Sequence, residues 1–227
     1  MTSSGPKPDP TLIVIAKAPD PGRVKTRLCP PCTPEQASEL AEAALQDTLD
    51  AVLAAPAGRR VLALQGEPGE WLPPGFQVIS QRGRGFAERL AAAFADSGGP
   101  AFLVAMDTPQ LTPALLEASA ARLTEPGVDA TIGPTPDGGY WGIGLRRPQA
   151  AVFRGVPMST NRTRDAQMRR LRALGLRTKV LPVLTDVDTM TEAQAVAFAA
   201  PSTRFACRLE ELGHATDHQQ PVSEAAA

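Results

Sequence analysis

Short apolar runs alternate along the chain with longer segments in which apolar residues recur every three or four positions. The runs at residues 12–16 and 101–105 are typical of strands buried on both faces, because polar residues do not alternate within them. Thr33 followed by Pro34 is typical of a helix start, with a capping residue and a proline in the first turn. The pattern predicts strands at about 12–16, 60–65, 77–81, 101–105, 128–132, 140–145 and 179–184, and helices at about 33–54, 86–95, 112–123, 161–174, from 191 onward and at 205–212.

This order of strands and helices predicts an α/β protein with a mostly parallel sheet and helices on both faces. Ligands of such sheets bind beyond the carboxyl ends of the strands. We expect one domain over residues 11–212, because no repeat or long linker divides it. Residues 1–10 read as a disordered leader and residues 213–227 as a flexible tail.

Composition narrows the range of partners. Of the 227 residues 43% are hydrophobic and 21% charged, and the formal net charge is -1. Without a strong positive charge, neither a nucleic-acid nor a membrane partner is expected. No apolar run reaches the ~18 residues of a membrane span, and the first residues do not resemble a signal peptide. The three cysteines fit a reducing compartment, so we expect a cytoplasmic protein.

Three cations lie close together just after the first predicted strand. Arg23, Lys25 and Arg27 follow Gly22 in a loop that also contains prolines. Such a loop suits the phosphates of a nucleotide, since lysine supplies a point charge and arginine a bidentate fork. It is not a Walker A loop, because no glycine directly precedes the lysine. The alternative is an ordinary solvated basic turn.

Carboxylates follow two other predicted strands. Asp107 comes directly after the strand at 101–105, where a single carboxylate can hold Mg²⁺ whose other ligands are water and substrate phosphates. A helix-capping role is less favoured, because Thr112 already starts the next helix. Asp186 and Asp188 follow the last strand and could complete the metal site. Alternatively they form an Asx turn before the helix at 191.

A glycine-rich segment joins the strands at 128–132 and 140–145. Its sequence Asp137-Gly138-Gly139-Tyr140 allows backbone to approach a ligand closely, and it is also typical of a hairpin turn. Both interpretations can hold together.

Histidine and cysteine offer little chemistry. His214 and His218 both lie in the predicted tail, which argues against a histidine-based triad or zinc hydrolase. Cys29 and Cys32 have the spacing of a metal or redox pair, and Cys207 with His214 could complete a site. Two ordinary thiols are the better interpretation of a lone pair.

Together these segments resemble the DUF2064 group of bacterial GT-A-fold transferases. That group is similar to phospholactate guanylyltransferase and more distantly to the molybdenum-cofactor nucleotidyltransferases. The resemblance covers about residues 11–200 and rests on Ala16-Lys17-Ala18-Pro19 through Gly22, Lys25-Thr26-Arg27-Leu28, residues 81–89, Asp107-Thr108-Pro109, Gly133-Pro134, Asp137-Gly138-Gly139-Tyr140 and Asp186-Val187-Asp188-Thr189. Cys29, Cys32 and the residues after about 200 lie outside the pattern.

The resemblance implies a three-layer α/β/α GT-A fold, like that of nucleotide-diphospho-sugar transferases, and roles for individual residues. Lys25 and Arg27 would hold phosphates and act in catalysis with Asp107. Mg²⁺ or Mn²⁺ would bind Asp107, with Asp188 as the second carboxylate. Gln81 would contact the base or ribose, and residues 137–140 would line the acceptor pocket. The implied substrate-binding residues are Ala16, Lys17, Gly22, Arg23, Gln81, Asp137, Gly138, Gly139 and Tyr140.

Three functions follow as hypotheses. The first is nucleotidyl transfer, which joins a nucleoside monophosphate from a triphosphate to a small phosphorylated acceptor and releases pyrophosphate. Asp107 stands in an Asp-x-Pro context, as in nucleotidyltransferases, and not in the Asp-x-Asp of most GT-A glycosyltransferases. The second is glycosyl transfer from a nucleotide sugar, with Asp137 as the base. The third is a non-catalytic nucleotide-binding module.

Overall fold

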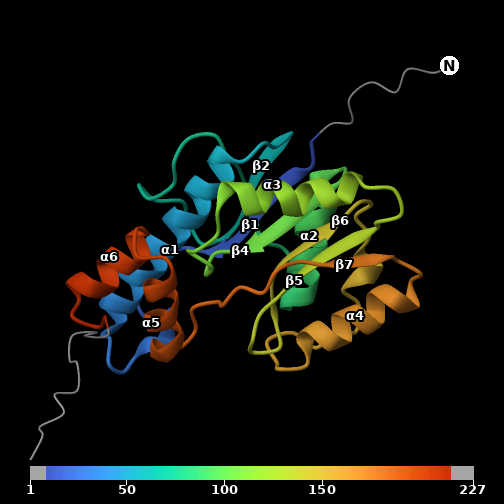
Figure 1. The fold of residues 1–227 in the computed structure, drawn as a ribbon. Helices are drawn as coiled ribbons and strands as arrows, with labels where there is room; N and C mark the ends of the chain where they lie inside the picture. The colour runs from blue at the N-terminus through green and yellow to red at the C-terminus, as the bar shows by residue number, and fades with distance from the viewer. Residues whose placement is uncertain (1–8, 216–227) are drawn as a thin grey trace, which may run out of the picture.

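The computed structural model describes residues 9–215 and contains one seven-stranded sheet (Figure 1). The strands lie in the order β3-β2-β1-β4-β6-β5-β7. All neighbouring pairs are parallel except those of β6, which is antiparallel to β4 and β5. The strands are β1 (Thr11–Lys17), β2 (Arg59–Gln65), β3 (Gln77–Ser80), β4 (Ala101–Ala105), β5 (Ala130–Pro134), β6 (Tyr140–Leu145) and β7 (Thr178–Val180).

Helices cover both faces of this sheet, as the apolar runs predict. Alternate residues of β1 point to opposite faces, and both sets are buried. Val14 belongs to a core with α1 and α3, while Ile13 belongs to a second core with α2 and α4. The helices are α1 (Pro34–Ala54), α2 (Phe86–Ser97), α3 (Pro113–Ala121), α4 (Thr163–Ala173), α5 (Met190–Ala199) and α6 (Arg204–Glu211). The predicted α/β/α architecture is therefore confirmed.

Local sequence explains where α1 begins. The Thr33 side chain accepts a hydrogen bond from the Gln36 N–H, and the Gln36 side chain accepts one from the Thr33 N–H. This capping box satisfies two donors that the helix itself cannot satisfy. The helix is 21 residues long, so its C-terminal half packs on the sheet while its N-terminal half extends beyond the sheet into another core.

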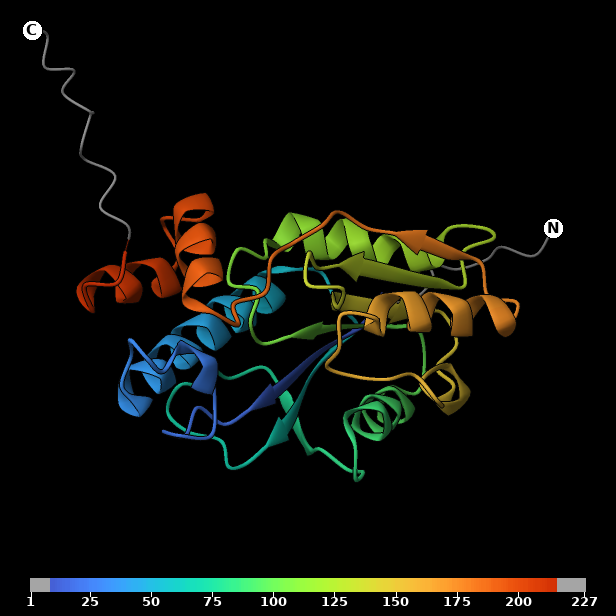
Figure 2. The same cartoon turned by 90° about the horizontal axis from the view of Figure 1, so that it is seen from below.

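This other core is the third one in the protein, and it lies beside the sheet. The N-terminal half of α1 packs there against α5 and α6, which lie together at one end of the molecule (Figure 2). Leu28 and Val187, from two loops at the carboxyl end of the sheet, are buried in the same core. The third core therefore supports the loops that carry the basic segment and the last two aspartates.

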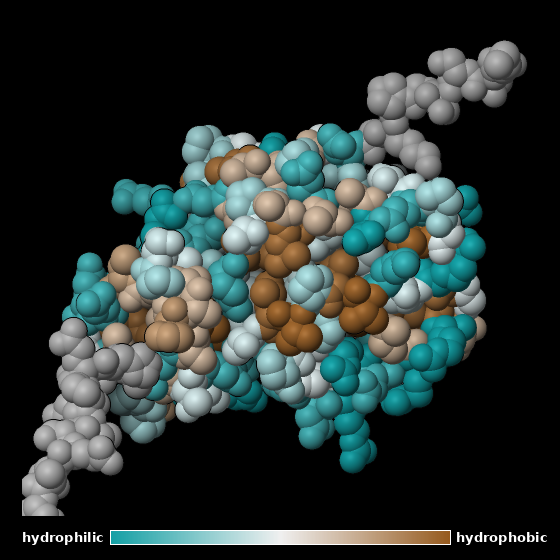
Figure 3. All heavy atoms as spheres, in the orientation of Figure 1, coloured by the Kyte–Doolittle hydropathy of each residue, from teal (hydrophilic) through white to brown (hydrophobic). Residues whose placement is uncertain are grey.

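The predicted strand at 179–184 is wrong in extent. β7 ends at Val180. The Leu181 N–H still donates to the Ile132 carbonyl of β5 at 2.8 Å, but the next bond to β5 comes from the Leu184 N–H to the Pro134 carbonyl at 3.2 Å, so the regular register is lost after Leu181. β7 is also an edge strand, so Val180 and Val183 are 61% and 59% exposed. Figure 3 shows hydrophobic surface near the middle of this face, over β7 and the segment after it. β5 likewise starts at Ala130, two residues later than predicted.

Three short 3-10 helices were not predicted: η1 (Thr26–Leu28), η2 (Arg122–Thr124) and η3 (Ala150–Val152). Residues 1–8 and 216–227 lie outside the described part of the chain, so the proposed leader and most of the proposed tail remain predictions. Within residues 9–215, no helix is both long and apolar enough to cross a membrane.

Candidate functional site

A cavity of about 810 Å³ lies at the carboxyl ends of the strands. Its walls come from the end of β1 and the loop after it, the segment after β4, the turn between β5 and β6, and the segment after β7. The start of α2, residues 158–161 and Thr163 complete it. This is where a mostly parallel sheet is expected to bind its ligand.

Lys25 lies at the centre of a charged cluster in this cavity. Its ammonium nitrogen is 2.9 Å from Asp107 Oδ2 and 3.3 Å from Asp188 Oδ1, and it also donates to the Val187 carbonyl. The side chain is only 10% exposed. Burial alone would lower the pKa of Lys25, but the two carboxylates more than offset it and the pKa is raised. Lys25 is therefore a buried cation with two anionic partners.

Arg27 extends the cluster toward solvent. Its guanidinium donates to Asp188 Oδ2 at 2.9 Å and the side chain is 70% exposed. Both oxygens of Asp188 thus face a cation. Lys25 itself has a left-handed backbone with φ 46° at the start of η1, a conformation that costs energy for a residue with a Cβ.

Backbone contacts fix the carboxylates in place. The Val187 N–H donates to the Asp107 carbonyl at 2.9 Å, which ties the segment after β7 to the segment after β4. The Glu192 carboxylate accepts from the Asp188 and Thr189 N–H groups at 3.0 and 2.7 Å. These bonds are part of the capping of α5, so the start of that helix positions Asp188.

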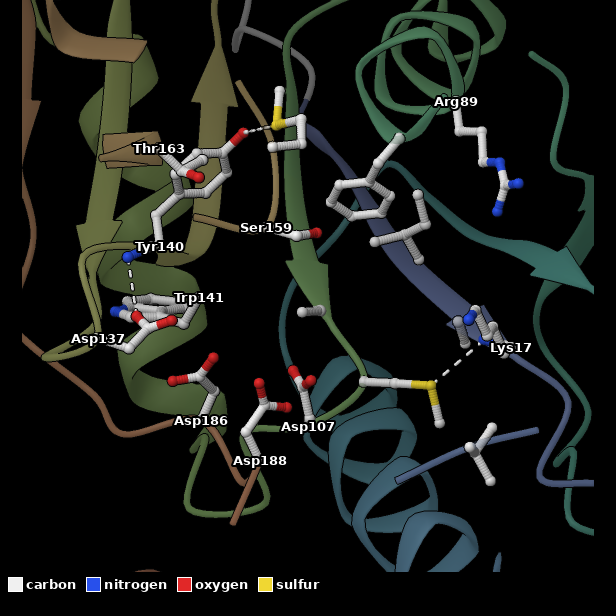
Figure 4. A pocket seen from close by; sticks show the side chains of 18 of the residues that line it. Lys17, Arg89, Asp107, Asp137, Tyr140, Trp141, Ser159, Thr163, Asp186 and Asp188 are labelled. Atoms are coloured by element: carbon white, nitrogen blue, oxygen red, sulfur yellow. Dashed lines mark hydrogen bonds between the residues drawn. The ribbon is translucent and has the colours of Figure 1, made fainter. Parts of the chain in front are cut away.

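Asp186 lies on the same side of the cavity as Asp107 and Asp188 (Figure 4). Burial, followed by the charges of Asp107, Asp137 and Asp188, raises the pKa of Asp186 to about 7. The cavity therefore concentrates negative charge on this side, and this side suits a cation.

Asp137 is held by its own turn. Its Oδ1 accepts from the Thr135 hydroxyl and from the Gly139 N–H, the latter at 2.8 Å. Tyr140 follows, with its hydroxyl 3.9 Å from the Met158 sulfur, and burial raises the pKa of Tyr140 above its usual range. The phenol therefore stays protonated, and its O–H is directed at the Met158 sulfur.

The opposite wall is basic. Lys17 and Arg89 lie there, across the cavity from Asp137 and Tyr140 (Figure 4). On the same side the Gln81 amide nitrogen donates to the Ala16 and Ala63 carbonyls, at 2.7 and 3.0 Å. These two bonds use both amide hydrogens and fix the orientation of the Gln81 amide.

Most residues predicted for the site do come together. The cavity is lined by Ala16, Lys17, Arg23, Lys25, Arg27, Gln81, Asp107, Asp137, Gly139, Tyr140 and Asp188. Gly22 and Gly138 are not among its lining residues. A Cβ on Gly138 would lie 2.1 Å from the Asn161 carbonyl oxygen, so this glycine lets two loops pack closely.

Other residues line the cavity although the sequence indicated no role for them: Arg84, Phe86, Arg89, residues 158–161 and Thr163. The first three fall within the segment 81–89 that carries part of the resemblance. Residues 158–163 lie just before and at the start of a predicted helix, and no motif marks them as part of a site. Ser159 has φ 58°, a strained backbone of the kind that often occurs at ligand sites, and nothing in the sequence marks this strain.

The side chains in the cavity include the right type of ligand for a divalent cation, but they are not arranged as a complete metal site. Asp107 and Asp188 offer the oxygen ligands that Mg²⁺ prefers, and the ammonium between them marks a position that suits a cation. Within the described residues, however, no three His, Cys, Asp or Glu side chains are arranged to hold a metal. Cys29, Cys32 and Cys207 are free thiols.

Comparisons with known proteins agree with this fold. No curated protein sequence matched the chain. A candidate nucleotide-diphospho-sugar transferase from Desulfovibrio desulfuricans G20 has a similar structure, with 25% identity, a TM-score of 0.81, and coverage of 91% of this chain and 96% of that one. CMP:2-keto-3-deoxy-manno-octonic acid synthetase complexed with CTP is 13% identical with a TM-score of 0.54, over 85% of this chain and 99% of that one.

A third structure, Rv0371c from Mycobacterium tuberculosis H37Rv in complex with manganese, is 20% identical with a TM-score of 0.51, over 83% of this chain and 97% of that one. At these identities, the second and third structures speak for the fold alone. The profile of the family described as "Uncharacterized protein conserved in bacteria (DUF2064)" matches residues 39–160. The chain therefore belongs to the DUF2064 family, with the fold of nucleotide-diphospho-sugar transferases.

Proposed function

We propose that this chain is a divalent-metal-dependent transferase that holds a nucleotide by its phosphates and transfers part of it to a small acceptor. The observation that carries the proposal is the cluster of Lys25, Arg27, Asp107 and Asp188 at the carboxyl ends of the strands. The likeness to the candidate nucleotide-diphospho-sugar transferase supports it.

The reaction we favour is nucleotidyl transfer. An acceptor oxygen attacks the α-phosphorus of a nucleoside triphosphate, the bond to the bridging oxygen breaks, and pyrophosphate leaves. Lys25 and Arg27 neutralise the negative charge that grows on the leaving group. Asp107 and Asp188 would hold Mg²⁺ or Mn²⁺, which supplies Lewis-acid stabilisation of phosphate oxygens when bound.

The charges around the cavity suggest how the substrates lie. Lys17, Arg84 and Arg89 line the wall formed by β1 and α2, and this wall suits the anionic nucleotide. The opposite wall contains Asp137 and the uncharged residues 158–161, and it suits the acceptor. An acceptor phosphate bound against this second wall would lie near the Asp137 carboxylate, with no cationic side chain of the wall to offset its charge.

One feature favours glycosyl transfer as a second candidate. Asp137 Oδ1 is occupied by Thr135 and Gly139, which leaves Oδ2 to accept a proton from an acceptor hydroxyl. A nucleotide sugar could bind the same basic wall and the same metal. The two reactions differ in the bond that breaks and therefore in their products.

Product analysis separates these functions. The purified protein is incubated with Mg²⁺, pooled small acceptors, and either nucleoside triphosphates or nucleotide sugars. Nucleotidyl transfer releases pyrophosphate from the triphosphates, whereas glycosyl transfer releases a nucleoside diphosphate from the sugar nucleotides. Release of neither product, together with tight nucleotide binding, would favour a non-catalytic module and contradict our proposal.

Asp107→Asn tests the metal assignment. We expect it to lower kcat by about a hundredfold or more, as the loss of a group that stabilises transition-state charge does elsewhere. Asp96→Asn is the control, because Asp96 pairs with Arg82 and does not line the cavity. Unchanged activity in Asp107→Asn would rule out this carboxylate as a metal ligand.

A further inference from the structure

We propose that Lys25 acts as an internal counter-ion that competes with the divalent metal for Asp107 and Asp188, so that metal and nucleotide bind together. The inference rests on the proposed function, because it concerns the regulation of the same site. Two cations compete for the same oxygen atoms, and this competition can be measured without any turnover.

The contacts of Lys25 leave little room for a second cation. Its ammonium lies between Asp107 Oδ2 and Asp188 Oδ1, and the Val187 carbonyl accepts a third hydrogen bond from it. An ammonium has three hydrogens, so all its donors are used inside the protein. Arg27 engages the other oxygen of Asp188. A metal ion at the two carboxylates would therefore have to displace the ammonium.

Displacement is unfavourable when no other anion is present. Lys25 is 10% exposed, and an ammonium that loses both carboxylates would remain partly buried beside a divalent cation. Breaking a buried ion pair by removing one partner is strongly destabilising, and the two cations would also repel each other. The free protein should thus bind metal weakly, even though its carboxylates are of the right kind.

The phosphates of a nucleotide change this balance. Lys25 lines the cavity, and its flexible side chain can reach a phosphate placed there. Phosphate oxygens then replace the carboxylates as partners of the ammonium, which frees Asp107 and Asp188 for the metal. The metal gains phosphate ligands at the same time. Each ligand consequently increases the affinity of the other, and the coupling is reciprocal.

Lys25→Met tests the competition directly, because methionine has a similar length and no charge. The affinity for Mn²⁺ is measured by titration of its electron paramagnetic resonance signal, with no nucleotide present. We expect Lys25→Met to bind Mn²⁺ about tenfold or more tightly than the unsubstituted protein, within the usual range of coupling between sites. Lys17→Met is the matched control: it removes the same charge from the cavity wall, and none of the hydrogen bonds of Lys17 involve the two carboxylates.

A second measurement uses the unsubstituted protein, in case Lys25→Met does not fold. The chain has four lysines, at positions 7, 17, 25 and 179. Acylation with acetic anhydride, followed by mass spectrometry, compares Lys25 with the exposed Lys17 and Lys179. Lys25 should react slowly in the free protein and faster once Mn²⁺ is bound, while the two exposed lysines keep their rates.

The outcomes are distinct. Equal or weaker Mn²⁺ binding by Lys25→Met, or acylation of Lys25 that does not change with bound Mn²⁺, overturns the competition but leaves the transferase proposal standing. If neither protein binds Mn²⁺ at any concentration tested, the metal requirement of the proposed function fails, and the competition fails with it.

Discussion

Gly138 illustrates how closely the residues around this site are packed. Its φ is 90°, and a Cβ would lie 2.1 Å from the Asn161 carbonyl oxygen. We expect Gly138→Ala to destabilise the protein by about 1–3 kcal/mol through overpacking and backbone strain. Because the clash is with Asn161, which lines the cavity, the substitution should also weaken acceptor use. Urea denaturation and acceptor KM measure the two effects.

Gly155→Ala is the matched control for that substitution. Gly155 also has a positive φ, of 75°, but no atom lies within 4 Å of the position that a Cβ would take there, so only the backbone strain is added. Equal effects of the two substitutions on acceptor KM would contradict a packing role for Gly138.

The sequence predicts where these residues lie in the sheet better than it predicts their contacts. Lys25, Arg27 and Asp107 follow the ends of strands. Because an apolar run shows where a strand ends, the sequence correctly predicts that these residues lie at the carboxyl edge of the sheet. That Lys25 binds carboxylates in the free protein is not readable, because it depends on how loops after β1, β4 and β7 meet. The contribution of Ser159 depends on tertiary packing in the same way.

At the scale of elements, the reliability of prediction follows burial. Central strands such as β1 and β4 are buried on both sides and match their apolar runs closely. The edge strand β7 pairs with β5 alone and ends at Val180, although the apolar run that predicts it continues to residue 184. The antiparallel direction of β6 follows from the short turn after β5, which leaves no room for a crossover helix.

The start of β7 depends on one carboxylate, and this gives a pH prediction. Asp129 Oδ2 accepts from the Arg177 N–H at 3.0 Å and from its guanidinium Nε at 3.2 Å. The backbone bond, followed by the Arg177 side chain and charge, lowers the pKa of Asp129 despite some opposing burial. A carboxylate with a lowered pKa stabilises the fold above its unfolded-state pKa of about 3.9, and that contribution disappears as the pH falls through the folded-state value.

We therefore expect Asp129→Asn to cost about 1 kcal/mol in the free energy of unfolding at pH 7 and much less near pH 2–3. Urea denaturation at several pH values measures the difference between the two proteins. Asp165→Asn is the control, since Asp165 is exposed and pairs only with its neighbour Arg164. If the loss of stability in Asp129→Asn stayed constant with pH, the ionised Asp129 carboxylate would not be the source of the stabilisation.

At the scale of the whole molecule, the site depends on a core that is not under the sheet. Leu28 and Val187 are buried with α5, α6 and half of α1, and each is next in sequence to a charged residue of the cluster. Helix packing at one end of the molecule thus sets the distance between the loop of Lys25 and Arg27 and the segment of Asp188. The sequence predicts α5 and α6 as helices, but no pattern in it links them to the site.

Two leucines of equal burial test this dependence. Leu209 in α6 and Leu171 in α4 are both 0% exposed, so replacing either with alanine should cost about 2–5 kcal/mol of stability. Only Leu209 belongs to the core that contains Leu28 and Val187. We expect Leu209→Ala to weaken binding of a nucleotide with Mg²⁺ several-fold more than Leu171→Ala, in calorimetric titrations well below both melting temperatures. Equal losses would mean that binding follows overall stability, and no loss in either would mean that the third core does not position Asp188.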